Sequence, residues 1–153
     1  MENRHGLCVA AGVAAADGPA ERRNARQLVA RVERRQRLRP RTLGMDSGSD
    51  DGKFLAALER AGVLPHVPIR RGRIVAQGVA GQVRRRARRR MRQARYRVSQ
   101  RIRKRVEEIF GWCQTVGRMA RTRFIGRWKI AQEVLVTVSD YNLVRLARLE
   151  ARP

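Results

Sequence analysis

Residues 41–69 have the sequence RTLGMDSGSDDGKFLAALERAGVLPHVPI. A short apolar run leads into a loop rich in Gly, Ser and Asp. The apolar residues that begin at Phe54 then predict a short amphipathic helix that ends at Gly62. Residues 63–69 follow as a second short strand, whose two prolines favour a sheet edge or an irregular strand. Because a strand–helix–strand unit normally places its strands in parallel, this stretch predicts an α/β fold.

Two elements are predicted before this unit. Residues 6–16 are small and apolar, which favours a buried strand or a tight hairpin. Asp17-Gly18-Pro19 is a turn that can open a helix, and Pro40 ends that segment. The apolar residues of this helix follow the i, i+3, i+4, i+7 spacing of a single face, namely Ala25, Leu28, Val29 and Val32.

The second half of the chain is predicted to be mainly helical. Residues 70–97 combine glycines with many arginines, so we expect a mobile, solvated insertion that becomes helical from Gln82 onward when bound. Residues 99–117 predict a helix, 118–127 a basic connector and 128–148 a last helix. The residues expected to share the buried faces are Ile102, Val106, Ile109, Phe110 and Cys113 on the first helix, and Trp128, Ala131, Val134, Leu135, Val138 and Leu146 on the second.

The chain carries a formal net charge of +23 over 153 residues, about the length of one domain. Such a basic excess indicates a polyanionic partner, with nucleic acid as the first expectation and an anionic membrane surface as the alternative. No apolar run approaches about 20 residues, so no membrane-spanning helix is expected. Cys8 and Cys113 lack CxxC spacing, which fits a reducing cytoplasm and neither a zinc site nor a disulfide framework.

A dense basic run leads into the helix predicted at 99–117. Between Arg84 and Arg105 the sequence has twelve arginines, one lysine and no acid, a composition suited to holding phosphates. Glu107 and Glu108 follow directly, and a carboxylate pair at this place either holds a metal ion that acts on a phosphate or neutralises its basic neighbours. At about 100° per residue, Glu107 lies on a polar stripe beside the apolar face, whereas Glu108 points towards solvent. Glu107 is therefore the better candidate site residue.

Asp46 is the other acid placed for chemistry. It stands at the carboxyl end of the first predicted strand, where ligands bind in open α/β sheets. Two carboxylates brought together by the fold could hold Mg²⁺, and a pair of such ions supports phosphodiester cleavage. Plainer roles are also open: Asp46 as a turn or helix-cap residue, and Glu107 as an i,i+4 salt-bridge partner of Arg103. His5 and His66 have no acid or cysteine at ligand spacing and are expected to be structural.

The sequence SQRIRKRVEEIFGWCQTVG at residues 99–117 closely resembles the last catalytic segment of bacterial insertion-sequence transposases of the DDE type. The resemblance extends over nearly the whole chain. Three further stretches agree in the same order, namely residues 1–7, residues 42–50 with the strand at 65–67, and residues 120–126 with Tyr141-Asn142-Leu143.

This resemblance implies an RNase H-like fold, DNA as substrate, two-metal Mg²⁺ (or Mn²⁺) chemistry, and DNA strand cleavage and transfer. It also implies that Asp46 is the second catalytic, metal-binding carboxylate and Glu107 the third. Arg103 stands at the arginine of the family's Y-x2-R-x3-E-x6-K signature, while Gln100 and Gln114 replace its tyrosine and lysine. The DNA-binding residues expected are Arg84, Arg85, Arg86, Arg88, Arg89, Arg90, Arg103, Gln114, Arg121 and Arg123.

The family's first catalytic aspartate has no counterpart in this chain, because the strand that carries it would precede Met1. We therefore expect an RNase H-like domain over residues 1–153 that is truncated at its N-terminus, lacks the first central strand, and has residues 70–97 as an insertion before the catalytic helix. Such a chain is expected to be inactive alone, either as a transposase remnant or as one part of an enzyme made in two pieces.

The expected partners follow from the same resemblance. They are transposon-end DNA, a second copy in a homodimer, or an N-terminal transposase half, in the bacterial cytoplasm at the nucleoid and without a membrane. Two alternatives share the basic surface: a non-catalytic nucleic-acid-binding protein, and a regulatory fragment that competes with a full-length transposase.

Overall fold

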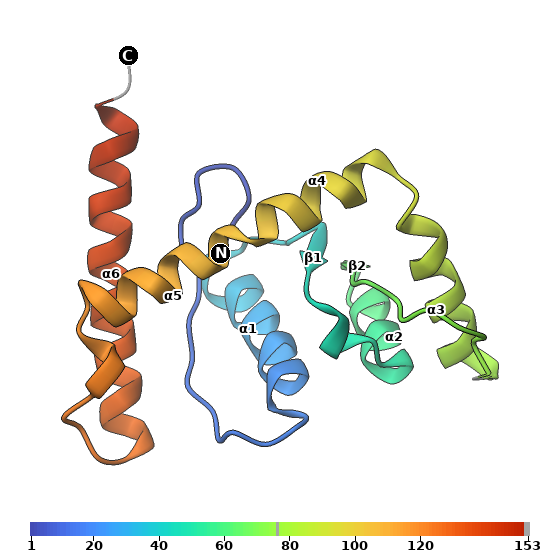
Figure 1. Ribbon diagram of the computed structural model, residues 1–153, viewed down its shortest axis with the longest axis horizontal. Coiled ribbons are helices and arrows are strands. Elements are labelled where there is room, and N and C mark those ends of the chain that lie inside the picture. Colours follow the sequence, from blue (N-terminus) through green and yellow to red (C-terminus); the bar gives the residue numbers. More distant parts are fainter. Residues whose placement is uncertain (76, 152–153) are drawn as a thin grey trace.

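A computed structural model describes residues 1–75 and 77–151. It has a mixed, helix-rich α/β architecture in which most elements gather around a small two-stranded sheet, while the last helix stands to one side (Figure 1). The elements in chain order are α1 (Ala20–Gln36), β1 (Thr42–Gly44), the 3-10 turn η1 (Ser47–Ser49), α2 (Gly52–Arg60), β2 (Leu64–His66), α3 (Gly78–Arg90), α4 (Ala94–Arg103), α5 (Arg105–Thr115), the 3-10 turn η2 (Met119–Arg121) and α6 (Arg127–Glu150).

β1 and β2 form a parallel pair in which Thr42 lies opposite Leu64. Because α2 connects these strands, the predicted strand–helix–strand unit is confirmed. α2 begins after Asp51, whose carboxylate accepts a hydrogen bond from the backbone N–H of Phe54 at 2.7 Å. Gly62 follows the helix with a φ of 73°, a conformation that glycine adopts without the steric cost of a Cβ atom.

The hydrophobic core lies where α2, β2 and α3 meet. Leu55 and Leu58 of α2 and Val67 after β2 are almost completely buried in it. α1 contributes the partly buried Ala25 and Val29, so the apolar stripe predicted for this helix does face the core. The core therefore forms around the strand–helix–strand unit on which the prediction of an α/β fold was based.

α3 is part of this core, contrary to the expectation of a solvated segment at residues 70–97 that becomes helical only when bound. Val83 and Ala87 are each 1% exposed, and together they form an i, i+4 apolar stripe. α3 and α2 approach so closely that a Cβ atom on Gly52 would lie 2.7 Å from the Cβ atom of Ala80. The prediction failed because two apolar residues among many arginines resemble a solvated segment until a partner surface is known.

Residues 6–16 form neither a strand nor a hairpin, so that prediction is wrong. The segment lies beside α6 instead. The backbone N–H of Cys8 donates to Oδ1 of Asn142 at 2.8 Å, the Nδ2 group of Asn142 donates to the Cys8 carbonyl at 2.9 Å, and the Tyr141 hydroxyl donates to the carbonyl of Gly6. Side chains of α6 thus satisfy backbone groups that the prediction assigned to a sheet.

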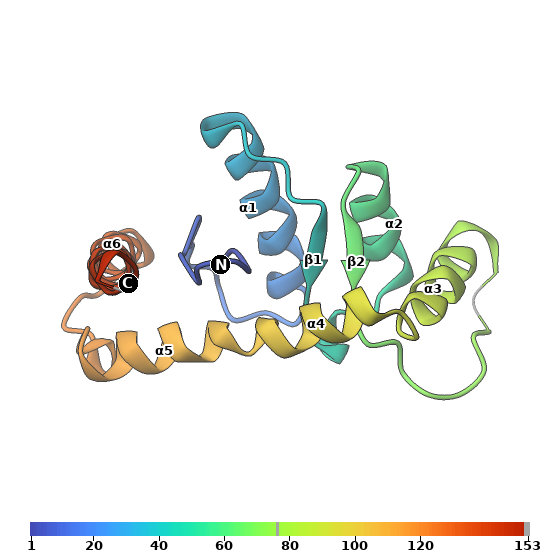
Figure 2. The ribbon, with the colours of Figure 1, turned by 90° about the horizontal axis from the view of Figure 1, so that it is seen from above.

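The single helix predicted at 99–117 is divided at Lys104 into α4 and α5. The two helices still follow one another as a long arm that runs from the sheet to α6 (Figures 1 and 2). The last predicted helix is confirmed as α6, which packs on α5. None of the helices in the described part of the chain is both long and apolar enough to cross a membrane.

Several residues expected to be buried in this region are exposed. Trp128 is 73% and Phe110 62% exposed, and Leu135 and Leu146 are also exposed. Ile109, by contrast, is buried as predicted. The difference arises because α6 stands apart from the sheet (Figure 2), so only the part of its apolar surface near α5 and the N-terminal segment is covered.

Candidate functional site

α4 lies across the carboxyl ends of both strands. The side-chain amide of Gln100 donates hydrogen bonds to the backbone carbonyls of Met45, just after β1, and of His66, the last residue of β2. Arg103 packs on β1, since a Cβ atom built on Gly44 would lie 3.7 Å from the Cβ atom of Arg103. Two segments far apart in sequence therefore meet at the strand ends, and Gln100, which replaces a tyrosine of the transposase signature, fastens one to the other.

Asp46 follows directly after this contact. Its side chain is exposed, and its backbone is extended at the start of η1. The Oδ1 atom accepts a hydrogen bond from the backbone N–H of Gly48 at 2.9 Å, the geometry of a short helix cap. The capping role that the sequence allowed for Asp46 is therefore present, and it occupies one of the two carboxylate oxygens.

Glu107 is exposed in the first turn of α5. Its predicted ion pair with Arg103 is not among those that the described residues form. The side chain of Arg103 packs on β1 instead, whereas the side chain of Glu107 is exposed. The Nε atom of Arg103 is buried and has no hydrogen-bond partner among the described residues.

The residues at the strand ends do not fit a two-ion magnesium site. Nowhere do three or more His, Cys, Asp or Glu side chains of the described residues come close enough together to hold a metal ion. Mg²⁺ is held by carboxylates together with further oxygen ligands in near-octahedral geometry. Asp46, partly engaged as a cap, and the exposed Glu107 do not make such a set by themselves.

His66 is a buried residue beside this site. Its side chain is almost completely buried, its ring meets Tyr96 edge-on with the centroids 5.6 Å apart, and neither ring nitrogen has a hydrogen-bond partner in the described part of the chain. Burial lowers the pKa of His66, and the charges of Arg95 and Arg90 lower it further. The structural role expected for His66 agrees with this environment, which favours the neutral ring.

Acids of α2 and of the preceding loop bind three of the nine arginines predicted to contact DNA. Arg84 forms an ion pair with Asp50, at 2.7 Å between Nη2 and Oδ2. Arg86 and Arg90 both pair with Glu59, each with 2.6 Å between nitrogen and oxygen. These pairs were missed because the acids lie far upstream in sequence, although the i,i+4 spacing of the last two arginines is one signal of a shared partner.

The pKa values of both acids reflect these contacts. Burial acts to raise the pKa of Asp50, but hydrogen bonds from Arg84 and from the backbone N–H of Arg70 bring it below its usual value. Burial likewise acts to raise the pKa of Glu59, and hydrogen bonds from Arg86 and Arg90 outweigh that effect. Both carboxylates are thus held in the charged form that their arginine partners require.

Apart from Arg103, which lies on α4, the other predicted DNA-binding residues lie in two places. Arg85, Arg88 and Arg89 are on α3, at one end of the molecule (Figure 1). Gln114, Arg121 and Arg123 are exposed at the other end, on α5 and in the segment that follows it. The predicted residues therefore do not form one continuous patch, and α4 with the first part of α5 lies between the two groups.

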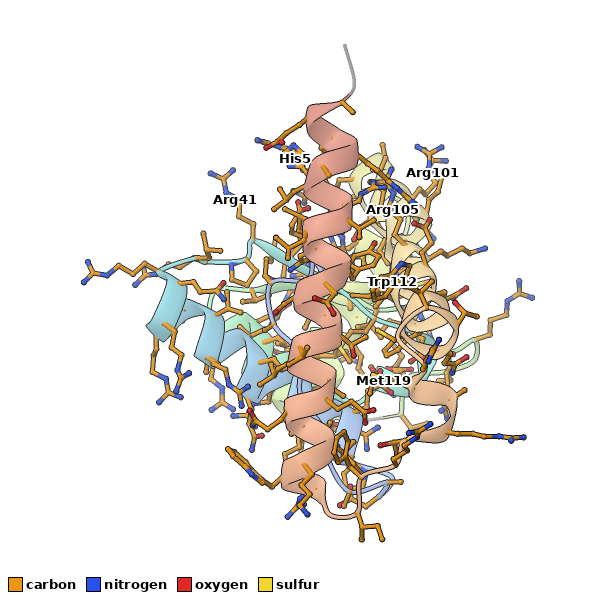
Figure 3. The ribbon with its side chains drawn as sticks, turned by 90° about the vertical axis from the view of Figure 1, so that its left-hand side faces the viewer. His5, Arg41, Arg101, Arg105, Trp112 and Met119 are labelled. Atoms are coloured by element: carbon orange, nitrogen blue, oxygen red, sulfur yellow. The ribbon has the colours of Figure 1, made fainter. Side chains whose placement is uncertain are left out.

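Some side chains of the α4–α5 arm extend into solvent, and others pack on α6. Figure 3 shows Arg101 of α4 extending away from the body of the molecule, so a basic group lies on the outside of the arm as well, and Arg41, just before β1, extends away on the opposite side. Trp112 lies beside α6, where its ring meets the ring of Tyr141 edge-on with the centroids 5.7 Å apart. Trp112 thus packs against α6, in contrast to the exposed Phe110, which was expected to be buried.

The family model of the transposase DDE domain matches residues 1–143. The chain therefore belongs to the family of transposases with a DDE domain, a family that acts in transposition on DNA and generally uses divalent metal ions. No curated protein and no solved structure matches the chain at a significant level. The family resemblance of the four sequence segments is thus confirmed.

Proposed function

We propose that this chain acts in DNA transposition as a DNA-binding portion of a DDE domain with an RNase H-like scaffold. The observation that carries the proposal is the family match over residues 1–143. Further support comes from α4, whose contacts with Met45 and His66 bring the segment before Glu107 to the strand ends that precede Asp46. In open α/β sheets, ligands bind at this end of the strands.

Within this proposal, Asp46 and Glu107 are the two catalytic carboxylates of the chain. The support is their position in the matching segments together with the exposure of both side chains, which leaves them open to a ligand. Because the described residues bring together no third metal-ligating side chain, we derive no cleavage step here. The 153-residue polypeptide by itself binds DNA and does not cut it.

A strand from outside residues 1–153, on the same polypeptide or on a second one, would supply what the site lacks. Among the described residues, β1 pairs only with β2, and residues 8–14 make no backbone–backbone hydrogen bond. A strand with an unpaired edge readily accepts a further strand. An added strand that carries an acid would extend the sheet beside β1 and bring that acid to the same end as Asp46.

The test is nicking of supercoiled DNA that carries transposon ends, in the presence of Mg²⁺. The polypeptide alone should not nick, whereas addition of the N-terminal half of a DDE transposase should restore nicking. Glu107→Gln should abolish the restored activity and leave DNA binding intact. Robust nicking by the polypeptide alone that depends on Glu107 would overturn the claim of inactivity, and restored nicking that survives Glu107→Gln would remove Glu107 from the site.

A non-catalytic DNA-binding or regulatory role is the second candidate. It is favoured by the formal net charge of +23 and by the incomplete set of metal ligands among the described residues. Under this alternative, DNA binding is unchanged by EDTA and by the double substitution Asp46→Asn and Glu107→Gln, and the N-terminal half restores no nicking. Co-expression with an intact transposase then separates the two forms of this role, because only a regulatory fragment would change the transposition frequency.

A further inference from the structure

The loop before α3 and one face of that helix enclose an arginine-lined cleft of about 540 Å³. No carboxylate is among the residues that line it, which are Arg73, Ile74, Arg85, Arg88, Arg89 and Arg92. Guanidinium groups that share one space repel one another, and this repulsion is relieved when an anion enters. The composition of the cleft therefore selects a ligand with more than one negative charge.

Helical periodicity divides the arginines of α3 between two roles. The three that pair with Asp50 and Glu59 flank the buried stripe of Val83 and Ala87, and they hold α3 on α2. Arg85 and Arg89 lie on another face of α3, Arg92 lies in the turn that follows the helix at the i+7 position, and all three are exposed. In the described part of the chain, none of these three makes an ion pair or a side-chain hydrogen bond, so their charges remain available.

Arg88 fixes the shape of the cleft. Its guanidinium donates to the carbonyl of Gly72 at 2.8 Å and to the carbonyl of Arg70 at 2.6 Å, which ties the loop to the helix. The backbone N–H of Arg70 in turn donates to Asp50 at 3.0 Å, so the loop is fastened at a second point. A site whose walls are fixed before binding spends less free energy on ordering when the ligand arrives.

We propose that this cleft is a phosphate-binding site that takes successive phosphodiester groups of a DNA backbone. The residues that bind these phosphates are Arg73, Arg85, Arg89 and Arg92. A guanidinium suits this role because it offers two parallel N–H groups that match phosphate oxygens. The inference rests on the proposed function, from which it takes DNA as the anion. Since backbone phosphates carry no sequence information, the cleft binds DNA without regard to base sequence.

The test compares two triple variants with the same loss of charge. The cleft variant is Arg85→Gln, Arg89→Gln and Arg92→Gln. The control variant is Arg26→Gln, Arg34→Gln and Arg35→Gln on α1, whose arginines are exposed and make no ion pair or side-chain hydrogen bond among the described residues. Fluorescence anisotropy with a labelled duplex of arbitrary sequence measures affinity as a function of salt concentration.

We expect the DNA affinity of the cleft variant, but not that of the control variant, to depend less on salt concentration than the affinity of the wild type. Each phosphate contact contributes about 0.9 to the slope of log K against log salt, so three lost contacts reduce the slope by about 2.7. Between about 50 and 200 mM salt, the wild type should therefore lose about 40-fold more affinity than the cleft variant loses. The control variant should stay close to the wild type.

The outcomes separate the cleft from the proposed function. Absence of DNA binding by the wild type would overturn both. Binding that is reduced equally in the two variants would overturn the cleft and leave the proposed function standing. Phenylglyoxal modification of the wild type, read by mass spectrometry, covers the case of a cleft variant that fails to fold: DNA should protect Arg85 and Arg89 more than Arg34 and Arg35, and equal protection would overturn the inference.

Discussion

Arg84 and Asp50 form an ion pair with two hydrogen bonds, Nε to Oδ1 at 2.8 Å and Nη2 to Oδ2 at 2.7 Å, across 34 residues of sequence. The side chain of Asp50 is 0% exposed, so solvent does not compete for this contact. The pair connects the acidic loop after β1 to α3, which carries Arg84. It also links the position of α3 to the loop that begins at Asp46.

Replacement of Asp50 by Asn should lower the free energy of unfolding by about 3 kcal/mol, because removal of one member leaves a buried charge without its partner. Urea denaturation followed by circular dichroism measures the change. Arg85→Gln is the matched control, since an exposed arginine without partners should alter stability by no more than about 0.5 kcal/mol. Equal effects of the two substitutions would contradict a stabilising role for the pair.

Acid should destabilise the folded chain through Asp50 and Glu59. The pKa of each is lower in the folded state than in the unfolded state, so the unfolded chain takes up protons first as the pH falls. The stabilisation is complete above the pKa values of the unfolded state, which lie below about 4.5. It is lost as the pH falls through the pKa values of the folded state. Urea denaturation at a series of pH values should show this decline, and the double variant Asp50→Asn and Glu59→Gln should show a shallower one.

His66 should add a separate dependence on pH at higher values. Its folded-state pKa is lowered, so the unfolded chain binds the proton first as the pH falls below about 6.5, and stability decreases from there. His66→Phe keeps an aromatic ring against Tyr96 and should remove this part of the pH dependence. A pH profile of stability that His66→Phe leaves unaltered would count against a buried neutral His66.

The contact between α2 and α3 should be sensitive to one methyl group. Gly52→Ala places a Cβ atom 2.7 Å from that of Ala80 and should lower stability by about 1–3 kcal/mol through overpacking. The double variant with Ala80→Gly should recover part of the loss. Gly111→Ala in α5 is the control, because nothing lies within 4 Å of its added Cβ atom and the change should raise helix stability by about 0.5–1 kcal/mol. Thermal unfolding of the three variants measures these changes in stability.

The strand–helix–strand unit could be predicted from the sequence because its signals are local. Asp51 caps α2, Gly62 follows it, and the strands are bounded by turn residues. The position of α3 could not be predicted in the same way, because it depends on Asp50 and Glu59 meeting arginines that are distant in sequence. A side chain of such a helix shows its role only when the surface opposite it is known.

The candidate site was predictable only in part. The segments that contain Asp46 and Glu107 were identified through their resemblance to a transposase family, and the family match confirms that resemblance. The contact between α4 and the strand ends was missed, because the bonds from Gln100 to two backbone carbonyls leave no pattern in the sequence. The metal-binding role of the two acids stays a prediction.

The break in the arm at Lys104 has a mechanical consequence for the two acids. Asp46 follows β1 closely as the cap of η1, and Arg103, the last residue of α4, packs on Gly44 of β1. Glu107 lies beyond the break, on α5, which packs against α6. The separation of the two carboxylates therefore depends on the backbone conformation at a single connecting residue, and a change in the angle between α4 and α5 at Lys104 would alter that separation without altering either acid.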